Sequence, residues 1–339
     1  MSPDPRALDV RPRAVLAFDP PALVERIFGP DGLERLRAVV DLDPDVVVEV
    51  ASAAARGRLA EAELLVAGWG APPVPAGLVP RLRAVAYAGG VARTCVADPA
   101  ALAARGVTAS NARAANAVPV AEYALAMILL ANKKAHAAER AYRDRRVAPD
   151  VERLLTGAGN FRRTVGIVGA SLVGRRVVEL LRPFDLEVLL YSPELAPGPV
   201  PGLPGARAAD LDEVAARSDV LSLHQPLTPA TAGQIDARVL GLMPDGATLI
   251  NTARGGVVDG EALLAELCTG RIDAVLDVTD PEPLPPDSAL WSLPNVVLTP
   301  HLAGSTGTEL RRIGDSVVAE VERFARGLPF AHPEELVAS

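Results

Sequence analysis

The sequence is poor in cysteine and has no surplus of basic residues, and each shortage excludes a class of protein. Only two cysteines occur among 339 residues, Cys95 and Cys268, far apart in the chain. This excludes a disulfide scaffold and a cysteine-based zinc site, and it favours a reducing compartment such as the cytoplasm. The formal net charge is -8. A nucleic-acid-binding protein normally presents a basic face, so we expect no nucleic-acid partner.

Long hydrophobic runs are absent as well. The longest uncharged apolar stretch, 123–132, is far shorter than the ~20 residues that span a bilayer. The polar N-terminal stretch 1–13 has no apolar centre of the kind found in signal peptides. We therefore expect no membrane partner and a cytoplasmic location.

Short apolar runs rich in β-formers alternate with helical stretches along the chain, of which 49% is hydrophobic. This alternation is typical of α/β proteins with parallel sheets, and the length fits two domains of roughly 100–200 residues each. The predicted strands are 13–18, 63–68, 82–88 and 106–110 in the first part, and 164–168, 187–192, 219–224, 247–252, 273–278 and 296–299 in the second.

Capping residues predict where several helices begin. Asp236 and Asp259 each precede a helical stretch and are expected to cap it. Thr306 and Glu309 form a capping-box pattern at the start of a last helix. A long helix is predicted over 118–137; because it is apolar on most faces, we expect it to be buried at a domain junction.

A glycine-rich turn joins a predicted strand to a predicted helix in the stretch V-G-I-V-G-A-S-L-V-G-R-R. Gly169 ends the strand and Leu172 starts the helix, the context of a dinucleotide-binding fingerprint. Gly169 would permit the tight turn, and Gly174 would let the helix pack close to the strand. The N–H groups of the helix N-terminus would face a pyrophosphate.

The fingerprint departs from the usual pattern at two positions. Ser171 replaces the middle glycine, so its Cβ would crowd the pyrophosphate or its hydroxyl would donate to it; the alternative is an ordinary glycine-rich turn. Ser192 stands where an aspartate usually binds the ribose. Because Glu194 would repel a 2′-phosphate and no arginine follows, the sequence favours NAD, with NADP left open.

Three later segments follow predicted strands and carry candidate catalytic side chains. N-T-A-R-G-G contains Arg254, D-V-T-D-P-E-P contains Glu282, and T-P-H-L-A-G contains His301. Ligands of open α/β sheets bind beyond the carboxyl ends of the strands, so the three side chains can converge on one crevice. Alone, each has an ordinary alternative: a surface ion pair, a solvated carboxylate or a capping histidine.

Together, these side chains suit the chemistry of a 2-keto acid. Arg254 offers forked donors for the carboxylate and can polarise the ketone oxygen. His301 can deliver or remove the hydroxyl proton, since histidine titrates near neutrality. Glu282 can hold the imidazole in one tautomer and stabilise its cationic form. The sequence shows no cluster of metal ligands.

These segments resemble the D-isomer-specific 2-hydroxyacid dehydrogenase family, whose motifs NxARG, DVxxxEP and PHxxG they match. The resemblance implies that Arg254, Glu282 and His301 are catalytic. It also implies a Rossmann NAD-binding domain (113–304) inserted into a flavodoxin-like substrate domain (1–112 and 305–339), both doubly wound parallel sheets, in a homodimer. The implied cofactor-binding residues are Gly169, Ser171, Leu172, Val173, Gly174, Ser192, Gln225, Pro226, Thr252, Ala253 and Asp277. Asp277 would bind the nicotinamide carboxamide.

The predicted substrate loop departs from the family pattern. The stretch 86–93 is A-Y-A-G-G-V-A-R, where family members read closer to A-G-V-G-V-D-N-I-D. The backbone of Gly89, Gly90 and Val91 can still offer N–H groups to a substrate carboxylate. Arg93 either binds a distal anionic group of the substrate or is simply solvated. Arg254 and His301 would complete the substrate site.

The sequence thus predicts an NAD(P)-dependent oxidoreductase acting on the CH–OH group of a D-2-hydroxy acid, or on its 2-keto acid in reverse. Phosphoglycerate and glycerate or hydroxypyruvate are the expected substrates. Two alternatives remain open. One is an NADPH-preferring glyoxylate or hydroxypyruvate reductase, and the other is a non-enzymatic NAD(H)-sensing corepressor or scaffold on the same fold.

Overall fold

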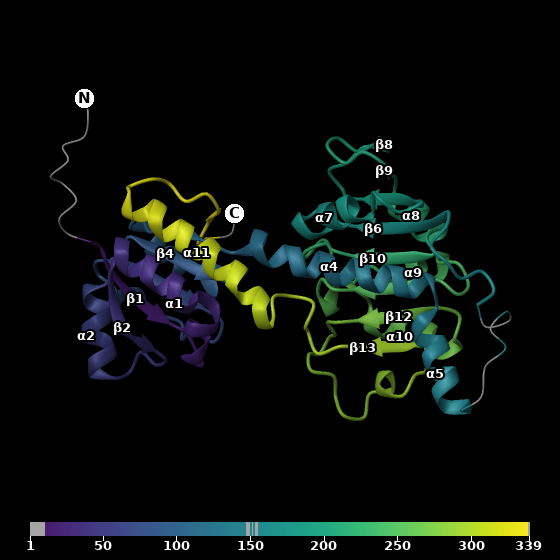
Figure 1. Ribbon diagram of the computed structural model, residues 1–339, viewed down its shortest axis with the longest axis horizontal. Coiled ribbons are helices and arrows are strands. Elements are labelled where there is room, and N and C mark those ends of the chain that lie inside the picture. The colour runs from purple at the N-terminus through teal and green to yellow at the C-terminus, as the bar shows by residue number, and fades with distance from the viewer. Residues whose placement is uncertain (1–10, 147–149, 151, 153–154, 338–339) are drawn as a thin grey trace. The chain divides into compact units, whose positions relative to one another are not determined.

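The chain divides into two compact units. The computed structural model describes residues 11–146, 150, 152 and 155–337. Unit 1 comprises Met1–Asn116 and Ser305–Ser339, and unit 2 comprises Ala117–Gly304 (Figure 1). The sequence placed the first boundary after Ala112, whereas the division in the structure follows Asn116.

Unit 1 is built on a six-stranded sheet in the order β14-β5-β4-β3-β1-β2. Strands β1 to β5 are parallel, and β14 joins β5 in antiparallel fashion. The order β2-β1-β3-β4-β5 is that of a flavodoxin-like sheet, as predicted. The strands are β1 (Arg13–Ala17), β2 (Asp41–Val47), β3 (Leu64–Gly68), β4 (Ala84–Ala88), β5 (Thr108–Ser110) and β14 (Pro333–Glu334).

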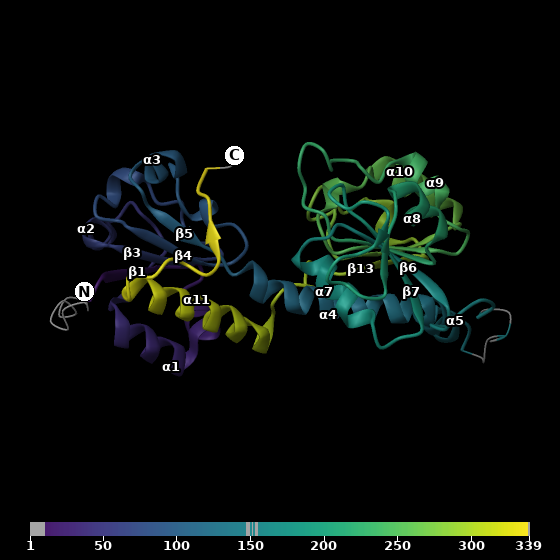
Figure 2. The same ribbon diagram turned by 90° about the horizontal axis from the view of Figure 1, so that it is seen from above.

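Helices cover both faces of this sheet (Figure 2). The helices are α1 (Ala22–Val39), α2 (Ala53–Glu61), α3 (Pro99–Ala104) and α11 (Leu310–Ala325). On one face, Ile27 of α1 and Val317 of α11 share a buried cluster with the strands. On the other, Leu59 of α2 and Leu102 of α3 do the same. The predicted capping box, Thr306 with Glu309, is present before α11.

Unit 2 is built on an eight-stranded sheet in the order β13-β12-β11-β10-β6-β7-β9-β8. All neighbours are parallel except β8 and β9. The chain first runs from β6 toward one edge and then returns to β10 on the other side of β6, so the topological switch point lies between β6 and β10. The strands are β6 (Arg163–Val168), β7 (Leu186–Tyr191), β8 (Gly198–Pro199), β9 (Ala206–Ala208), β10 (Val220–Leu223), β11 (Thr248–Asn251), β12 (Asp273–Leu276) and β13 (Val296–Leu298).

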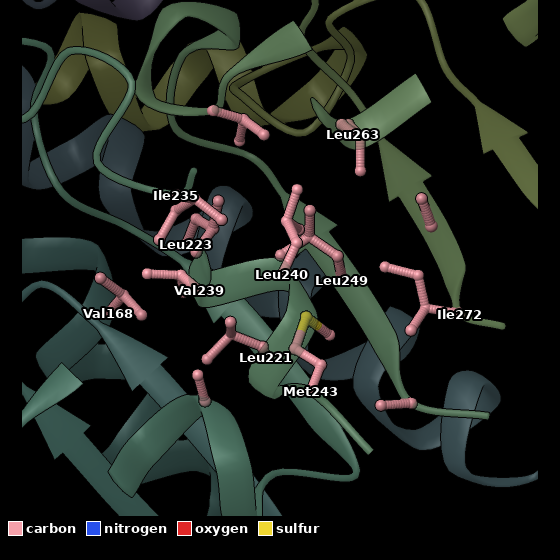
Figure 3. Close-up of a cluster of buried hydrophobic side chains, with 14 of the residues drawn as sticks. Val168, Leu221, Leu223, Ile235, Val239, Leu240, Met243, Leu249, Leu263 and Ile272 are labelled. Carbon is pink, nitrogen blue, oxygen red and sulfur yellow. The ribbon is translucent and has the colours of Figure 1, made fainter. Parts of the chain in front are cut away.

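Two layers of helices enclose the sheet of unit 2 (Figure 2). The helices are α4 (Arg113–Asn132), α5 (Ala135–Arg145), α7 (Leu172–Leu181), α8 (Leu211–Arg217), α9 (Ala237–Leu242) and α10 (Gly260–Thr269). Figure 3 shows the core on one face, where Val239 and Leu240 of α9 meet Leu221 and Leu249 of the strands. Helices α4 and α7 pack on the opposite face. Asp236 and Asp259 cap α9 and α10, as predicted.

The predicted helix 118–137 is two helices. The chain breaks at Lys134, whose φ of 50° is left-handed, and α5 begins at the next residue. Helix α4 has the length and mean hydropathy, 1.6, of a membrane-spanning helix, although no span was predicted. Its residues Ala121, Ala124 and Ile128 are nevertheless fully buried against the sheet of unit 2, so this stripe already contacts protein.

Candidate active site

Three loops at one edge of the unit 2 sheet carry the predicted catalytic side chains. Strands β11, β12 and β13 are parallel neighbours, so their carboxyl ends lie at the same edge. The first two loops touch, because a Cβ built on Gly255 would overlap the backbone of Thr279. The fold therefore places Arg254, Glu282 and His301 on adjacent loops of one unit.

His301 and Glu282 form a hydrogen-bonded pair. The distance from His301 Nδ1 to Glu282 Oε1 is 2.6 Å. Both side chains are accessible, with exposed fractions of 49% for His301 and 40% for Glu282. Because Nδ1 is occupied by the carboxylate, Nε2 is the atom that can meet a substrate; within the described residues it has no protein partner. Glu282 therefore fixes both the tautomer and the orientation of the ring.

Asp277 holds the loop that carries His301. His301 has a φ of 52°, in the left-handed region, and its N–H donates to the Asp277 carbonyl at 3.0 Å. The Asp277 carboxylate is buried and accepts from the N–H groups of Leu302 and Ala303, each at 2.9 Å, and from the Thr299 hydroxyl at 2.6 Å. An unfavourable backbone conformation persists where its surroundings fix it, and Asp277 supplies that constraint.

This role of Asp277 was missed at the level of sequence. The resemblance implied a contact between Asp277 and the nicotinamide carboxamide. In the structure, the side chain is 2% exposed and its oxygens are engaged by the loop of His301. The position of Asp277 directly after β12 indicated a residue at the site. Its hydrogen-bond partners lie more than twenty residues further along the chain, so the local sequence could not predict them.

Arg254 lies at the same sheet edge, and within the described residues no hydrogen bond or ion pair joins it to His301 or Glu282. Its side chain is exposed, and Nη1 donates to the carbonyl of Ala253 at 2.6 Å. The Asn251 amide donates to the Arg254 carbonyl at 2.9 Å and so fixes the turn. Among residues that the structure describes, no carboxylate forms an ion pair with Arg254. Its guanidinium is thus open to an external carboxylate.

The fingerprint turn has the shape expected of a dinucleotide site. Gly169 has a φ of 100°, and a Cβ there would lie 2.6 Å from the backbone nitrogen of Gln225. A Cβ on Gly174 would overlap the Gly169 carbonyl, so close packing of α7 on β6 requires glycine. The first-turn N–H groups of Leu172 and Val173 have no partner within the helix, and α7 begins just beyond β6, one of the two strands at the switch point.

Ser171 caps the helix and does not present a free hydroxyl. Its Oγ accepts from Gly174 N at 3.2 Å and donates to the His224 carbonyl at 2.8 Å. The hydroxyl proton of Ser171 is therefore already donated to a main-chain carbonyl, so the structure does not support the predicted hydrogen bond from this hydroxyl to a phosphate. The cap ties the glycine-rich turn to the end of β10.

Ser192 closes the same turn from the end of β7. It is 6% exposed, and its Oγ accepts from Ala170 N at 3.3 Å. The same side chain donates to Glu194, and this hydrogen bond lowers the pKa of Glu194 below its usual value. Glu194 is therefore ionised at neutral pH, next to the position that reads the ribose in this fold.

The other predicted cofactor residues line the ends of β10 and β11. Gln225 is 5% exposed, and its Oε1 is buried with no partner among the described residues, so a hydroxyl of a bound dinucleotide can donate to it. Thr252 and Ala253 are buried directly after β11, whereas Pro226 is exposed. This orphaned acceptor and the glycine cradle fit a dinucleotide.

His224 is a buried neutral histidine beneath this site. Its Nε2 lies 2.9 Å from Ser222 Oγ, and burial lowers the pKa of His224 to about 3. In the unfolded chain the pKa of histidine is ~6.5. Below that value the unfolded state binds a proton that the folded state does not, so stability falls as the pH decreases toward 3.

We therefore expect the free energy of unfolding to drop by about 1 kcal/mol per pH unit below pH ~6.5 on account of His224. Urea unfolding of the wild type and of His224→Gln at pH 7, 6 and 5 measures this. The variant should show the shallower acid dependence, and His332→Ala, at an exposed histidine, should keep the wild-type slope. Equal slopes for wild type and His224→Gln would contradict the assignment.

The predicted substrate loop lies in unit 1. Gly89, Gly90 and Val91 directly follow β4, at the carboxyl edge of that sheet. Arg93 is exposed in the short helical turn Ala92–Cys95, and no ion pair to it is found in the described part of the chain. Within the described residues, no group of three or more His, Cys, Asp or Glu side chains could hold a metal ion.

Comparison with known proteins identifies the family. The model of the D-isomer specific 2-hydroxyacid dehydrogenase NAD binding domain matches residues 125–303, just over half of the chain. The chain therefore belongs to the D-isomer specific 2-hydroxyacid dehydrogenase family, and unit 2 is its NAD-binding domain. The Rossmann and flavodoxin-like folds predicted from the resemblance are confirmed.

Individual relatives support the assignment. D-3-phosphoglycerate dehydrogenase of Mycobacterium tuberculosis is 34% identical over 317 residues, which is 93% of this chain and 55% of that protein. Hydroxypyruvate reductase of Thermotoga maritima is 35% identical over 221 residues, or 64% of this chain and 70% of that protein. Apo D-mandelate dehydrogenase of Rhodotorula graminis has a TM-score of 0.78 at 25% identity, with 96% and 97% of the two chains covered. The chain spans about half the length of the phosphoglycerate dehydrogenases that it matches.

Proposed function

We propose that this protein is an NAD-dependent oxidoreductase that moves a hydride between the nicotinamide and carbon 2 of a D-2-hydroxy acid or its 2-keto acid. The observation that carries the proposal is the 2.6 Å hydrogen bond between His301 Nδ1 and Glu282 Oε1, at the carboxyl edge of the NAD-binding sheet. An oriented imidazole at that edge is what proton transfer to a substrate oxygen requires.

Each catalytic side chain has a distinct task. A bound nicotinamide would supply or accept the hydride. In the direction of reduction, His301 Nε2 gives its proton to the ketone oxygen while carbon 2 gains the hydride; in oxidation the same atom takes the hydroxyl proton. Glu282 accepts the hydrogen bond from Nδ1 and so leaves Nε2 for the substrate. Arg254 binds the substrate carboxylate with its planar fork of donors.

The surroundings of the ribose position support NAD over NADP. Glu194 keeps its negative charge through its hydrogen bond from Ser192, and a second negative charge on a 2′-phosphate would be repelled there. The positive charge of Arg175 also lowers the pKa of Glu194, and its Nε donates to the Ala170 carbonyl. We therefore propose a preference for NADH over NADPH.

The substrate class follows from the names of the relatives. Because those relatives include phosphoglycerate dehydrogenases and a hydroxypyruvate reductase, we propose that phosphoglycerate or glycerate, with the corresponding keto acids, is the substrate pair. We further propose a cytoplasmic homodimer with no nucleic-acid or membrane partner. Two free cysteines, of which Cys95 is buried and Cys268 exposed, suit a reducing compartment.

A panel of keto acids assayed with NADH and with NADPH tests the proposal. Glyoxylate, hydroxypyruvate, 3-phosphohydroxypyruvate and phenylglyoxylate are reduced in turn, and nucleotide oxidation is followed by absorbance. We expect steady turnover with at least one keto acid, and higher kcat/KM with NADH than with NADPH. NADH binding without turnover on any acid would contradict the proposal and favour the NAD(H)-sensing alternative.

A further inference from the structure

The last strand of the chain holds the candidate substrate loop, which we define as Gly89–Arg93. Strand β14 pairs with β5, with Glu334 opposite Ala109. From there the Glu334 side chain reaches the loop, and its Oε1 accepts a hydrogen bond from Ala92 N at 3.0 Å. The Glu334 side chain is 6% exposed, so this bond is shielded from water. A segment more than two hundred residues away thus fixes one peptide of the loop.

A second side chain, that of Arg113, contacts the same loop at Gly90, two residues before Ala92. Arg113, at the start of α4, donates from Nε to the carbonyl of Gly90. Its Nη2 also lies 3.6 Å from Glu334 Oε1, which makes an ion pair between the two side chains. The loop is therefore held at the Gly90 carbonyl and the Ala92 N–H by one arginine and one glutamate that are themselves joined. All four residues belong to unit 1.

The buried setting of Glu334 is unusual for a carboxylate. Its Oε2 has no hydrogen-bond partner among the described residues, although the atom is inaccessible to water. Tyr87 and Cys95 lie close enough for the charge of Glu334 to raise their pKa values, in addition to the larger effect of burial. Burial of the unpaired Oε2 opposes folding, and the contacts of Oε1 with Ala92 N and Arg113 offset that cost.

The loop needs such an anchor because of its composition. Two adjacent glycines, Gly89 and Gly90, give its backbone more freedom than other residues would. Backbone N–H groups bind a carboxylate well only if they are already aimed at it, since ordering them during binding costs affinity. Anchors on either side of Val91 restrict the peptides that would make this contact.

We propose that Glu334 is a positioning residue for the substrate: through Ala92 N, and with Arg113, it holds the Gly89–Val91 peptides ready for the substrate carboxylate. The inference rests on the proposed function, because it names the loop that binds the substrate of that reaction. Strand β14 would then contribute to substrate affinity, in addition to forming the edge of the sheet.

Three variants separate this role from a merely structural one. Glu334→Ala leaves the buried Ala92 N–H unpaired, so KM for the keto acid should rise about tenfold, equivalent to about 1.4 kcal/mol, with kcat and the Kd for NADH unchanged. Glu334→Gln keeps an acceptor for Ala92 N and should restore most of the affinity. Glu335→Ala, at the exposed neighbouring residue, is the matched control and should behave as wild type.

Hydrogen–deuterium exchange of the segment 90–95 provides a readout that does not depend on turnover. Exchange at Ala92 should be faster in Glu334→Ala than in wild type or Glu335→Ala. If exchange rises but KM does not, or if kcat falls at constant KM, the positioning role is wrong. If the wild type reduces no keto acid, the proposed function fails, whereas unchanged exchange in an active enzyme overturns the anchor itself.

Discussion

Replacing His301 by alanine is expected to lower kcat for keto-acid reduction by roughly 10²–10⁴-fold, the range that a positioned acid–base group contributes. The variant removes the Nε2 proton donor and leaves the hydride without a matching proton transfer. NADH binding should persist, because the fingerprint turn, Ser192 and Gln225 lie on other loops of unit 2. Steady-state kinetics and a fluorescence titration with NADH measure the two quantities.

A matched control makes this result specific. His332 is also an exposed histidine, and its backbone, not its ring, makes its hydrogen bonds to Asn111 and Glu320. His332→Ala should therefore retain wild-type kcat. Turnover of His301→Ala within a few fold of wild type would show that another group, or water, supplies the proton.

Replacing Arg254 by alanine is expected to damage binding and rate together, with kcat/KM lower by roughly a hundredfold or more. Two charge-assisted hydrogen bonds to a carboxylate are worth about 3 kcal/mol. Polarisation of the ketone strengthens in the transition state, so kcat should fall as well as KM rise. The melting temperature should stay close to that of wild type, because the side chain is exposed and forms no ion pair within the described residues.

Arg254→Lys tests whether the fork matters in addition to the charge. Lysine keeps a cation but cannot bind a carboxylate with two parallel bonds, so its kcat/KM should lie between those of wild type and Arg254→Ala. Arg238→Ala, at an exposed arginine of α9 paired with Asp212, is the matched control. A loss in Arg254→Ala no larger than in this control would remove Arg254 from the site.

Sequence patterns predicted the fold well where local residues decide it. Buried parallel strands such as β3 are continuous apolar runs, and the caps Asp236 and Asp259 act within three residues of their own positions. Strand β2 was missed, because its sequence D-L-D-P-D-V-V contains three acids and a proline. Asp43 can be buried there since Arg13 and Arg58, from β1 and α2, provide opposite charges.

The site was predictable in its residue types but not in its internal contacts. The motifs placed Glu282 and His301 on neighbouring strand ends, and the structure brings those two side chains together. The partner of the Ser171 hydroxyl is a main-chain carbonyl at His224, a contact that leaves no mark on the local sequence. Glu334 is a comparable case, since only the pairing of β14 with β5 brings it to Ala92 of the substrate loop.

The left-handed backbone at His301 attaches a conformational cost to its proposed role in proton transfer. Among non-glycine residues, such a φ costs about 1 kcal/mol or more, and glycine would adopt it without that cost. The proposed proton-transfer group therefore occupies a position at which glycine would leave the backbone less strained. If His301 acts as proposed, a glycine substitution at that turn would relax the backbone but abolish the reaction, so substitutions for heat resistance belong elsewhere in the molecule.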